Sequence, residues 1–583
     1  MGKKHNNLRW QLLLLPLLLF LAGCVGIPQR EPQSVQDLLV LKDHQHSSKN
    51  PIASEYQDLA DQAWSNRVAG SQAEYVVLLE RGDDALLARI HLIRSAQKTI
   101  DLQTFIWRDD STTRFVFDEL RKAAARGVRV RILIDALSKS GSASYLARMA
   151  ASHKNIQIVL YKPLSEYVEP GRFTFWDNLV FKARRMNRRM HNKLLLIDGR
   201  IGIVGGRNYE GKYFDRDDRF LFRDRDVVLI GPTVQEMEES FRVFWKDKEA
   251  VFLLQLKDVQ QAFKQLSHPV GNFLKPEEAA LFKEINRQAN AKSLASVREE
   301  LKVYEADRVR FIYDTPQKFD SAKEEKDFDA FFTKILNDAC CSLVYQTPYL
   351  IYERGTRKAF RRLKKRHPKF RIIASSNSLA AADHASAYAL SFKHRKQLYK
   401  KSGIDIYEAK PFPADRTRYV YQYEKLGDPG PRLCIHAKTI VVDRKKVMVG
   451  SHNFDPRSLN LNTECGVFID DEEIAKVLED QILNACAPEN AWTVSKAPTR
   501  PVISYFSGFI GGVSTALPFL DIWPYRYTTN FALKAEKKPL QPRDPHFLEN
   551  YINVGYFPEV PDSATVIHAR LMKAFGGWAR PMM

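Results

Sequence analysis

Short apolar runs alternate with amphipathic stretches along the middle of the chain, a pattern that predicts an α/β fold. Residues 99–107 are mostly apolar, β-branched or aromatic, which predicts a strand. Helical periodicity follows over residues 115–126, and a second apolar strand is expected over residues 128–135. Strand, helix and strand in this order predict a parallel βαβ unit.

The same order of elements recurs in the second half of the chain. Residues 342–350 predict a strand, a basic helical stretch follows, and residues 370–375 predict another strand. Gln103 and Thr104 match Gln346 and Thr347 at an offset of 243 positions. Such self-similarity indicates a duplication. The 583 residues are therefore expected to form two similar α/β/α sandwich halves.

The first 24 residues have the features of an export signal. A positively charged start precedes an apolar run over residues 12–21, which is too short to span a bilayer comfortably. Residues 21–24 read Leu-Ala-Gly-Cys and resemble the lipobox of bacterial lipoproteins. The resemblance implies a lipidated Cys24 and, because Val25 follows it, anchoring in the outer membrane facing the periplasm. A plain signal peptide and an uncleaved anchor are the alternatives.

The charge balance favours an anionic partner. The net charge is +20, and about +17 remains without the first 23 residues. Such an excess suits a phosphate-bearing substrate, a nucleic acid or an acidic lipid surface, although scattered solvated lysines and arginines also account for it.

The six cysteines show no zinc-site spacing and, with Cys24 lipidated, the remaining five cannot form a complete disulfide framework. Cys340, Cys434 and Cys465 lie in apolar or strand-like contexts, so we expect buried thiols there.

Two copies of a His-x-Lys-x4-Asp pattern are the strongest chemical signal. The first copy comprises His191, Lys193 and Asp198, and the second comprises His436, Lys438 and Asp443. An asparagine follows ten residues after each aspartate, at Asn208 and Asn453, and both the histidine pair and the asparagine pair are 245 positions apart. Two matches with the same continuation are not a chance occurrence.

These residue types suit phosphodiester chemistry without a metal or another cofactor. One imidazole can attack phosphorus while the other protonates the leaving alkoxide. Two lysines and two asparagines can stabilise the charge on the phosphoryl oxygens. Each copy carries half of this set, so both are expected to face one active site at the interface of the halves. Asp198 and Asp443 are expected to brace turns, and no carboxylate cluster near either copy suggests a magnesium site.

The paired motifs resemble the HKD motifs of the phospholipase D superfamily, over roughly residues 76–490. Further stretches at 188–193, 204–208, 224–232, 376–380 and 450–458 resemble bacterial cardiolipin synthases of the C type. The resemblance implies that His191 is the nucleophile and His436 the general acid, later the base. It also implies that acidic residues at Asp224 and Glu464 orient the catalytic imidazoles. The lipobox, the longer tether and the C-terminal extension depart from the family.

The domain organisation follows from these features. We predict a signal peptide (1–23), a tether (24–75), a first domain (76–250), a helical connector (251–310), a second domain (311–490) and a C-terminal extension (491–583). Aromatic and basic residues at 173–189 suit either a membrane interface or an amphipathic core helix, and residues 501–527 give a weaker signal of membrane contact.

The leading functional hypothesis is transfer of a phosphatidyl group from phosphatidylglycerol to a second phospholipid through a phosphohistidine intermediate, which yields cardiolipin. Hydrolysis through the same intermediate is the runner-up, and a nuclease or a non-catalytic envelope scaffold is less favoured. We expect phospholipid substrates and a membrane surface as partners, with no nucleic acid and no obligate protein partner.

Overall fold

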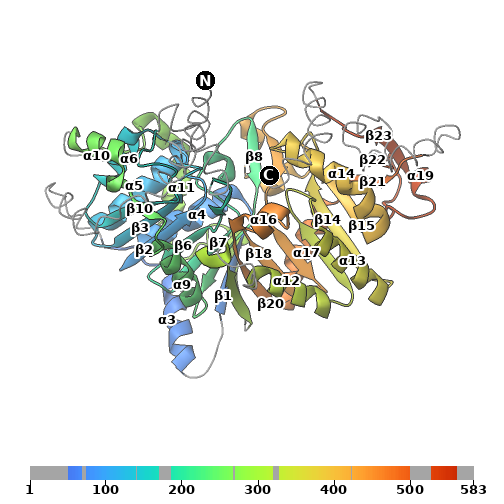
Figure 1. Cartoon of the computed structure of the whole chain (residues 1–583), viewed down its shortest axis with the longest axis horizontal. Coiled ribbons are helices and arrows are strands. Elements are labelled where there is room, and N and C mark those ends of the chain that lie inside the picture. The colour runs from blue at the N-terminus through green and yellow to red at the C-terminus, as the bar shows by residue number, and fades with distance from the viewer. Residues whose placement is uncertain are drawn as a thin grey trace, which may run out of the picture.

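The computed structural model describes residues 50–68, 74–139, 141–169, 186–266, 270–306, 308–319, 327–421, 423–498 and 527–560. The predicted signal peptide, Cys24 and the aromatic stretches at 173–181 and 501–526 lie outside these residues. The described chain forms two halves that lie side by side (Figure 1).

The first half contains a nine-stranded sheet. Its strands β2, β3 and β4 are mutually parallel, as the βαβ pattern predicts, and the flanking pairings are antiparallel. The order is β10-β4-β3-β2-β6-β7-β9-β1-β11. The strands are β1 Glu74–Leu79, β2 Thr99–Thr104, β3 Arg129–Asp135, β4 Ile156–Tyr161, β6 Leu194–Ile197, β7 Ile201–Gly205, β9 Asp226–Ile230, β10 Ala250–Phe252 and β11 Val303–Ala306.

The second half contains a ten-stranded sheet in the order β12-β20-β18-β17-β13-β14-β15-β21-β22-β23. Its first eight strands, taken in reverse, repeat the order of the first sheet from β10 to β1, which confirms the duplication and the predicted fold class. The strands are β12 Val309–Tyr313, β13 Ser342–Gln346, β14 Arg371–Asn377, β15 Ile404–Ala409, β17 Thr439–Val442, β18 Lys446–Gly450, β20 Cys465–Asp470, β21 Ala491–Lys496, β22 Thr528–Leu533 and β23 Tyr551–Gly555.

Helices cover the outer face of each sheet and fill the space between the sheets. One core packs α3–α6 on the first sheet, and another packs α12–α14 on the second. A third core contains α9 and α17 together with residues of both sheets, so it joins the halves. The longer helices are α3 Glu55–Val68, α4 Gly82–Ser95, α5 Ser111–Ala125, α6 Ala143–Ala150, α9 Val234–Trp245, α10 Lys257–Lys264, α11 Lys283–Gln288, α12 Asp327–Asp338, α13 Arg354–Arg366, α14 Ala385–Ser402 and α17 Glu472–Ala485.

Short elements complete the fold. They are η2 Gly211–Tyr213, η3 Leu253–Gln255, η4 Pro276–Phe282, η5 Glu299–Leu301, η6 Pro316–Phe319, α15 Arg416–Tyr419, η7 Tyr423–Leu426, α16 Pro456–Asn460 and α19 Phe547–Asn550. Nowhere in the described ranges does a helix combine the length and the apolar character that crossing a bilayer requires.

Two short parallel ladders exchange chain segments between the halves. β5 (Arg189–Met190) of the first half pairs with β19 (Asn462–Thr463) of the second. In the same way β16 (Arg432–Ile435) of the second half pairs with β8 (Phe220–Arg223) of the first. β5 and β16 each end immediately before a motif histidine, so both motifs begin at the interface.

Three segments outside the two predicted domains contain regular structure. The predicted tether includes α3, whose Tyr56, Ala60 and Ala63 are buried against the first core. The predicted connector includes α10, α11 and β11, which pairs with β1. Near the C-terminus β21, β22 and β23 extend the second sheet beyond β15.

A fully buried ion pair fixes the start of the first motif. The Arg189 guanidinium donates to both carboxylate oxygens of Asp135 at 2.6–3.0 Å, and both side chains are 0% exposed. Asp135 ends β3 and also accepts from the backbone amide of Met190. The pair therefore ties β5 to the edge of the sheet where the parallel strands end.

We predict that Arg189→Met lowers the free energy of unfolding by about 3–5 kcal/mol, because it leaves the Asp135 carboxylate buried and unpaired. Denaturant titration measures the loss. Arg242→Met, which breaks an exposed pair with Glu239, is the control and should cost less than about 1 kcal/mol. Adding Asp135→Leu to Arg189→Met should recover stability, and a double variant no more stable than the single one would contradict the prediction.

Candidate active site

Each motif imidazole is held by a carboxylate from the opposite half. His191 Nδ1 lies 2.8 Å from Glu464 Oε2, and His436 Nδ1 lies 2.6 Å from Asp224 Oδ2. The exchanged ladders create these pairs, because Glu464 directly follows β19 and Asp224 directly follows β8. The resemblance identified both acids, but nothing in the sequence indicated that they cross between the halves.

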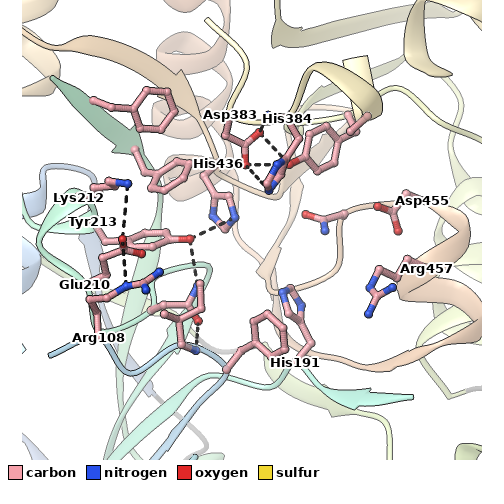
Figure 2. Close-up of a pocket in the computed structure, with 18 of the residues that line it drawn as sticks. Arg108, His191, Glu210, Lys212, Tyr213, Asp383, His384, His436, Asp455 and Arg457 are labelled. Carbon is pink, nitrogen blue, oxygen red and sulfur yellow. Dashed lines mark hydrogen bonds and ion pairs between the residues drawn. The ribbon is translucent and has the colours of Figure 1, made fainter. Parts of the chain in front are cut away.

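Both histidines line one cavity at the interface (Figure 2). The cavity has a volume of about 960 Å³. Asn208 and Asn453 also line it, so the structure brings together the His and Asn residues of both motifs. Neither Lys193 nor Lys438 is among the described side chains that line the cavity. The other described lining residues are Phe105, Ile106, Arg108, Glu210, Lys212, Tyr213, Asp217, Arg219, Phe220, Phe222, Tyr349, Ile351, Asp383, His384, Ser386, Ala387, Arg432, Asp455, Arg457 and Asn462.

The two lysines lie behind the imidazoles. Lys193 Nζ donates to the backbone oxygen of His191 at 2.7 Å. Lys438 Nζ contacts the backbone oxygen of His436 and lies 2.7 Å from its Nδ1. Both lysines are buried, and burial lowers the pKa of Lys193 to about 8. Each ammonium therefore places a positive charge next to the backbone of its motif histidine.

The electrostatics keep the imidazoles neutral and the carboxylates charged. Burial lowers the pKa of His191 to about 4 against the opposing effect of Glu464. Burial and Lys438 lower the pKa of His436, although Asp224 opposes this. Burial disfavours ionisation of Glu464, yet His191, His452 and Lys193 outweigh it and bring its pKa to about 2. A neutral His191 whose Nδ1–H donates to Glu464 has a lone pair on Nε2, as a nucleophile requires.

The surroundings of Asp224 leave no space for a side chain at Gly206. A Cβ at Gly206 would lie 2.2 Å from Asp224 Oδ1. The Asp224 carboxylate can therefore approach the backbone closely and accept from the amide of Arg225 at 2.8 Å. The glycine after β7 serves the positioning of Asp224.

Tyr213 is a cavity residue that the sequence reasoning missed. Its hydroxyl lies 3.5 Å from His436 Nε2 and accepts from Asn208 Nδ2 at 3.0 Å. Its ring stacks on Phe222, with centroids 4.5 Å apart. The aromatic ring beside His191 is that of Phe105, in a T-shaped contact with ring centroids 5.0 Å apart. Tyr213 lies five residues beyond Asn208 and outside the motif, so the pattern gave no signal for it.

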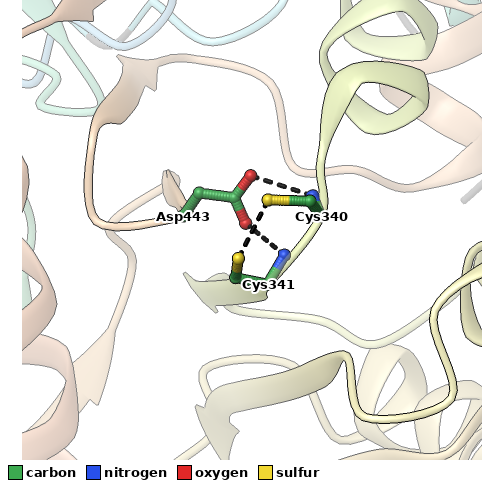
Figure 3. Close-up of side chains that lie close together, drawn as sticks. All are labelled: Cys340, Cys341 and Asp443. Atoms are coloured by element: carbon green, nitrogen blue, oxygen red, sulfur yellow. Dashed lines mark hydrogen bonds between the residues drawn. The ribbon is translucent and has the colours of Figure 1, made fainter.

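The motif aspartates lie at the far ends of their strands. Asp198 accepts from the backbone amides of Gln97, Lys98 and Thr99 at 2.7–3.3 Å, at the start of β2. Asp443 does the same for three amides at the start of β13, those of Cys340, Cys341 and Ser342, at 2.8–2.9 Å (Figure 3). Both aspartates have left-handed backbone, with φ of 56° and 55°.

One cysteine expectation is wrong. Cys434 and Cys465 are buried, but Cys340 is exposed because it lies in the bend before β13, where its backbone is directed toward Asp443. Cys340 and Cys341 have Sγ atoms 2.9 Å apart, and with Asp443 they form a group of potential metal ligands. The backbone amides of Gln97 and Lys98 fill the same role in the first half without thiols.

Comparison with known proteins adds a family context. The family described as "Cardiolipin synthase, PLD-like domain" (PLD, phospholipase D) matches residues 89–245 and 332–485. Cardiolipin synthase C of Escherichia coli (strain K12) is 32% identical over 419 residues, which cover 70% of this chain and 84% of that protein. An uncharacterized protein of Helicobacter pylori (strain ATCC 700392 / 26695) is 29% identical over 461 residues, 78% of this chain and 86% of its own. Among solved structures, phosphatidylserine synthase of Haemophilus influenzae Rd KW20 has a TM-score of 0.48 at 14% identity, covering 73% of this chain and 91% of that one.

We predict that kcat/KM for phosphatidyl-p-nitrophenol falls on the acidic side with a midpoint near pH 4. The resemblance implies that His191 is the nucleophile, and a nucleophile reacts in its neutral form. Because the pKa of His191 is lowered to about 4, this form persists at pH 5–6 and is lost as the pH falls through 4. The profile of kcat/KM reports the free enzyme, and this leaving group needs no proton. Circular dichroism at each pH controls for unfolding. A midpoint at pH 6.5 or above in the folded protein would contradict the assignment.

Proposed function

Because the chain belongs to the cardiolipin synthase family with phospholipase D-like domains, and is a phospholipase D-type enzyme, we propose that it transfers a phosphatidyl group. In this proposal the donor is phosphatidylglycerol and the acceptor is a hydroxyl of a second phospholipid. The products are cardiolipin and free glycerol.

The observation that carries the proposal is the pair of imidazoles in one cavity, each backed by a carboxylate of the other half. A binding protein has no need for two buried, oriented imidazoles beside two buried lysines. General acid–base and nucleophilic catalysis on a phosphodiester need this set. The geometry therefore favours an enzyme over a lipid-binding scaffold.

In the first step, Nε2 of His191 attacks the phosphorus of the donor. A phosphorus–nitrogen bond forms, and the bond between phosphorus and the headgroup oxygen breaks. His436 donates a proton to the departing oxygen. Burial and Lys438 lower the pKa of His436, but the negative charge of a bound phosphodiester favours its protonated form. Asp224 and Glu464 stabilise the positive charge that each ring carries during the cycle.

In the second step, neutral His436 removes the proton from the acceptor hydroxyl. The acceptor oxygen attacks phosphorus, the phosphorus–nitrogen bond breaks, and His191 is released unchanged. Water in place of the lipid hydroxyl gives phosphatidic acid, the hydrolytic outcome. Lys193 and Lys438 lie behind the rings and add positive charge at the phosphoryl group, while Asn208 and Asn453 face it from the cavity wall.

We further propose that lipidation at Cys24 anchors the enzyme to the envelope with its cavity at the periplasmic surface. Lipid anchoring would keep the cavity close to its substrates, since two or more acyl chains give stable attachment. We also propose that turnover needs no divalent ion, because the described site contains two lysines and two asparagines that can stabilise the phosphoryl charge. Activity that is lost in EDTA and restored by a divalent ion would overturn this last point.

We expect purified protein with labelled phosphatidylglycerol vesicles to form cardiolipin. Mass spectrometry of the products, with and without phosphatidylethanolamine in the vesicles, identifies the acceptor. Phosphatidic acid as the dominant product would favour hydrolysis, and release of nucleotides from DNA at a comparable rate would favour a nuclease.

The intermediate distinguishes the two histidines. His191→Ala should abolish turnover and covalent labelling, because His191 alone forms the bond to phosphorus. His436→Ala should still release p-nitrophenol from phosphatidyl-p-nitrophenol and become labelled, since general-acid assistance of roughly 10²–10⁴-fold matters least for a stable leaving anion. Acid-quenched labelling and peptide mapping give the position. A phosphohistidine at residue 436 would reverse the roles, and no adduct in the wild type would favour the scaffold.

A further inference from the structure

The duplication extends beyond the motifs into the two loops that form the cavity walls. At the offset of 245 that relates Asn208 to Asn453, Glu210 corresponds to Asp455 and Lys212 to Arg457. All six side chains line the cavity. Figure 2 shows Glu210 and Lys212 on one side of the two histidines, and Asp455 and Arg457 on the opposite side. We call the side with Glu210 and Lys212 the first wall and the side with Asp455 and Arg457 the second wall. Each wall carries an asparagine, an acid and a cation.

The walls differ at two further pairs of positions. Tyr213 corresponds to Ser458, whose hydroxyl accepts from the backbone amide of Asn453. At the offset of 243 that relates Gln103 to Gln346, Arg108 corresponds to Ile351, and both line the cavity. The first wall thus gains a guanidinium and a phenol where the second has an aliphatic side chain and a short hydroxyl. Divergence at equivalent positions indicates that the walls bind different groups.

The first wall has the charge of a site for one phosphate. Glu210 Oε1 lies 3.5 Å from Arg108 Nε and 3.6 Å from Lys212 Nζ, so two cations share one carboxylate and leave a net charge of +1. Glu210 is 11% exposed, whereas Arg108 and Lys212 are 51% and 36% exposed. The cations lie at the solvent side of the wall, and Tyr213, 1% exposed, lies at its inner end.

The reaction proposed above places the alcohol on this wall. In an in-line displacement the oxygen that leaves or attacks lies opposite the phosphorus–nitrogen bond. That oxygen exchanges its proton with His436, and the Tyr213 hydroxyl is the group 3.5 Å from His436 Nε2. Burial and Asp224 raise the pKa of Tyr213 well above its usual value, so the phenol remains a hydroxyl at neutral pH.

We infer that Tyr213, Arg108 and Lys212 form the acceptor subsite. The Tyr213 hydroxyl positions the acceptor alcohol beside His436, and Arg108 and Lys212 bind a phosphate that the same acceptor carries. The subsite therefore selects an alcohol with its own phosphodiester, as in a phospholipid headgroup with a free hydroxyl, over water and uncharged alcohols. This inference rests on the proposed function.

The test separates the donor step from the acceptor step. Phosphatidyl-p-nitrophenol is the donor, so the p-nitrophenol burst reports formation of the intermediate. Glycerol, soluble glycerol phosphate and phosphatidylglycerol vesicles are the acceptors. The ratio of their products reports how readily each acceptor reacts with the intermediate. The three acceptors distinguish an uncharged alcohol, a free phosphate and a lipid headgroup.

R108Q/K212Q should raise the KM for phosphatidylglycerol by about tenfold or more relative to the KM for glycerol, because two charge-assisted contacts are lost. R457Q, the matched change on the opposite wall, should keep this ratio of KM values within about twofold of the wild type. The same change of ratio in R457Q, or an unchanged ratio in R108Q/K212Q, would overturn the inference. An effect with glycerol phosphate as large as that with phosphatidylglycerol would identify the phosphate alone as the recognised group.

Y213F should lower transfer to alcohols about tenfold or more beyond its effect on the burst, and should increase the share of hydrolysis. A smaller loss shared equally by the burst and the transfer would reduce Tyr213 to a structural residue and overturn its role. If wild-type protein releases no p-nitrophenol, the proposed function fails first. If release is normal while the acceptor preference of all variants is unchanged, the subsite alone fails.

Discussion

The arrangement of this protein depends on one constraint: each reactive imidazole must receive its carboxylate from the other half of the chain. Glu464 reaches His191, and Asp224 reaches His436, because the short ladders carry each acid across the interface. A buried carboxylate without its partner is costly, and so is a buried imidazole in the wrong orientation. Docking of the halves and assembly of the site are therefore the same event. The shared core around α9 and α17 supplies the apolar burial that holds this arrangement together.

Duplication gives both halves the same catalytic motif, and later divergence has made the two sides of the cavity different. The motifs, the crossing acids and the polar loops are common to both halves. What differs is the neighbour of each imidazole: the Tyr213 hydroxyl lies 3.5 Å from His436 Nε2, whereas His191 makes a T-shaped ring contact with Phe105. The asymmetry agrees with the division into a nucleophile and an acid–base that the family resemblance implies. It lies in the walls rather than in the motifs, so two nearly identical motifs have different surroundings.

The sequence was sufficient for the elements that local pattern determines. Strands β6 and β17 match the apolar runs that follow Lys193 and Lys438, and the constant offsets predicted two similar sheets. The crossing of Asp224 and Glu464 could not be predicted, since it depends on which half a two- to four-residue strand joins. Tyr213 was missed because a tyrosine near an asparagine is unremarkable until the fold places it beside a histidine. Cys340 was misjudged because its apolar neighbours say nothing about a bend whose amides are directed toward Asp443.

The location of the duplicated halves in a single polypeptide has a consequence for how such a site can change. A homodimer of one half would have the same crossing carboxylates, but its two walls would be encoded by the same codons. Any substitution would appear on both sides, so a tyrosine gained by one wall would be imposed on the other. When both halves lie in one polypeptide, a substitution in one wall no longer changes the other. Arg108 and Ile351, or Tyr213 and Ser458, can then be selected separately, and a symmetric cleft becomes one whose two walls differ.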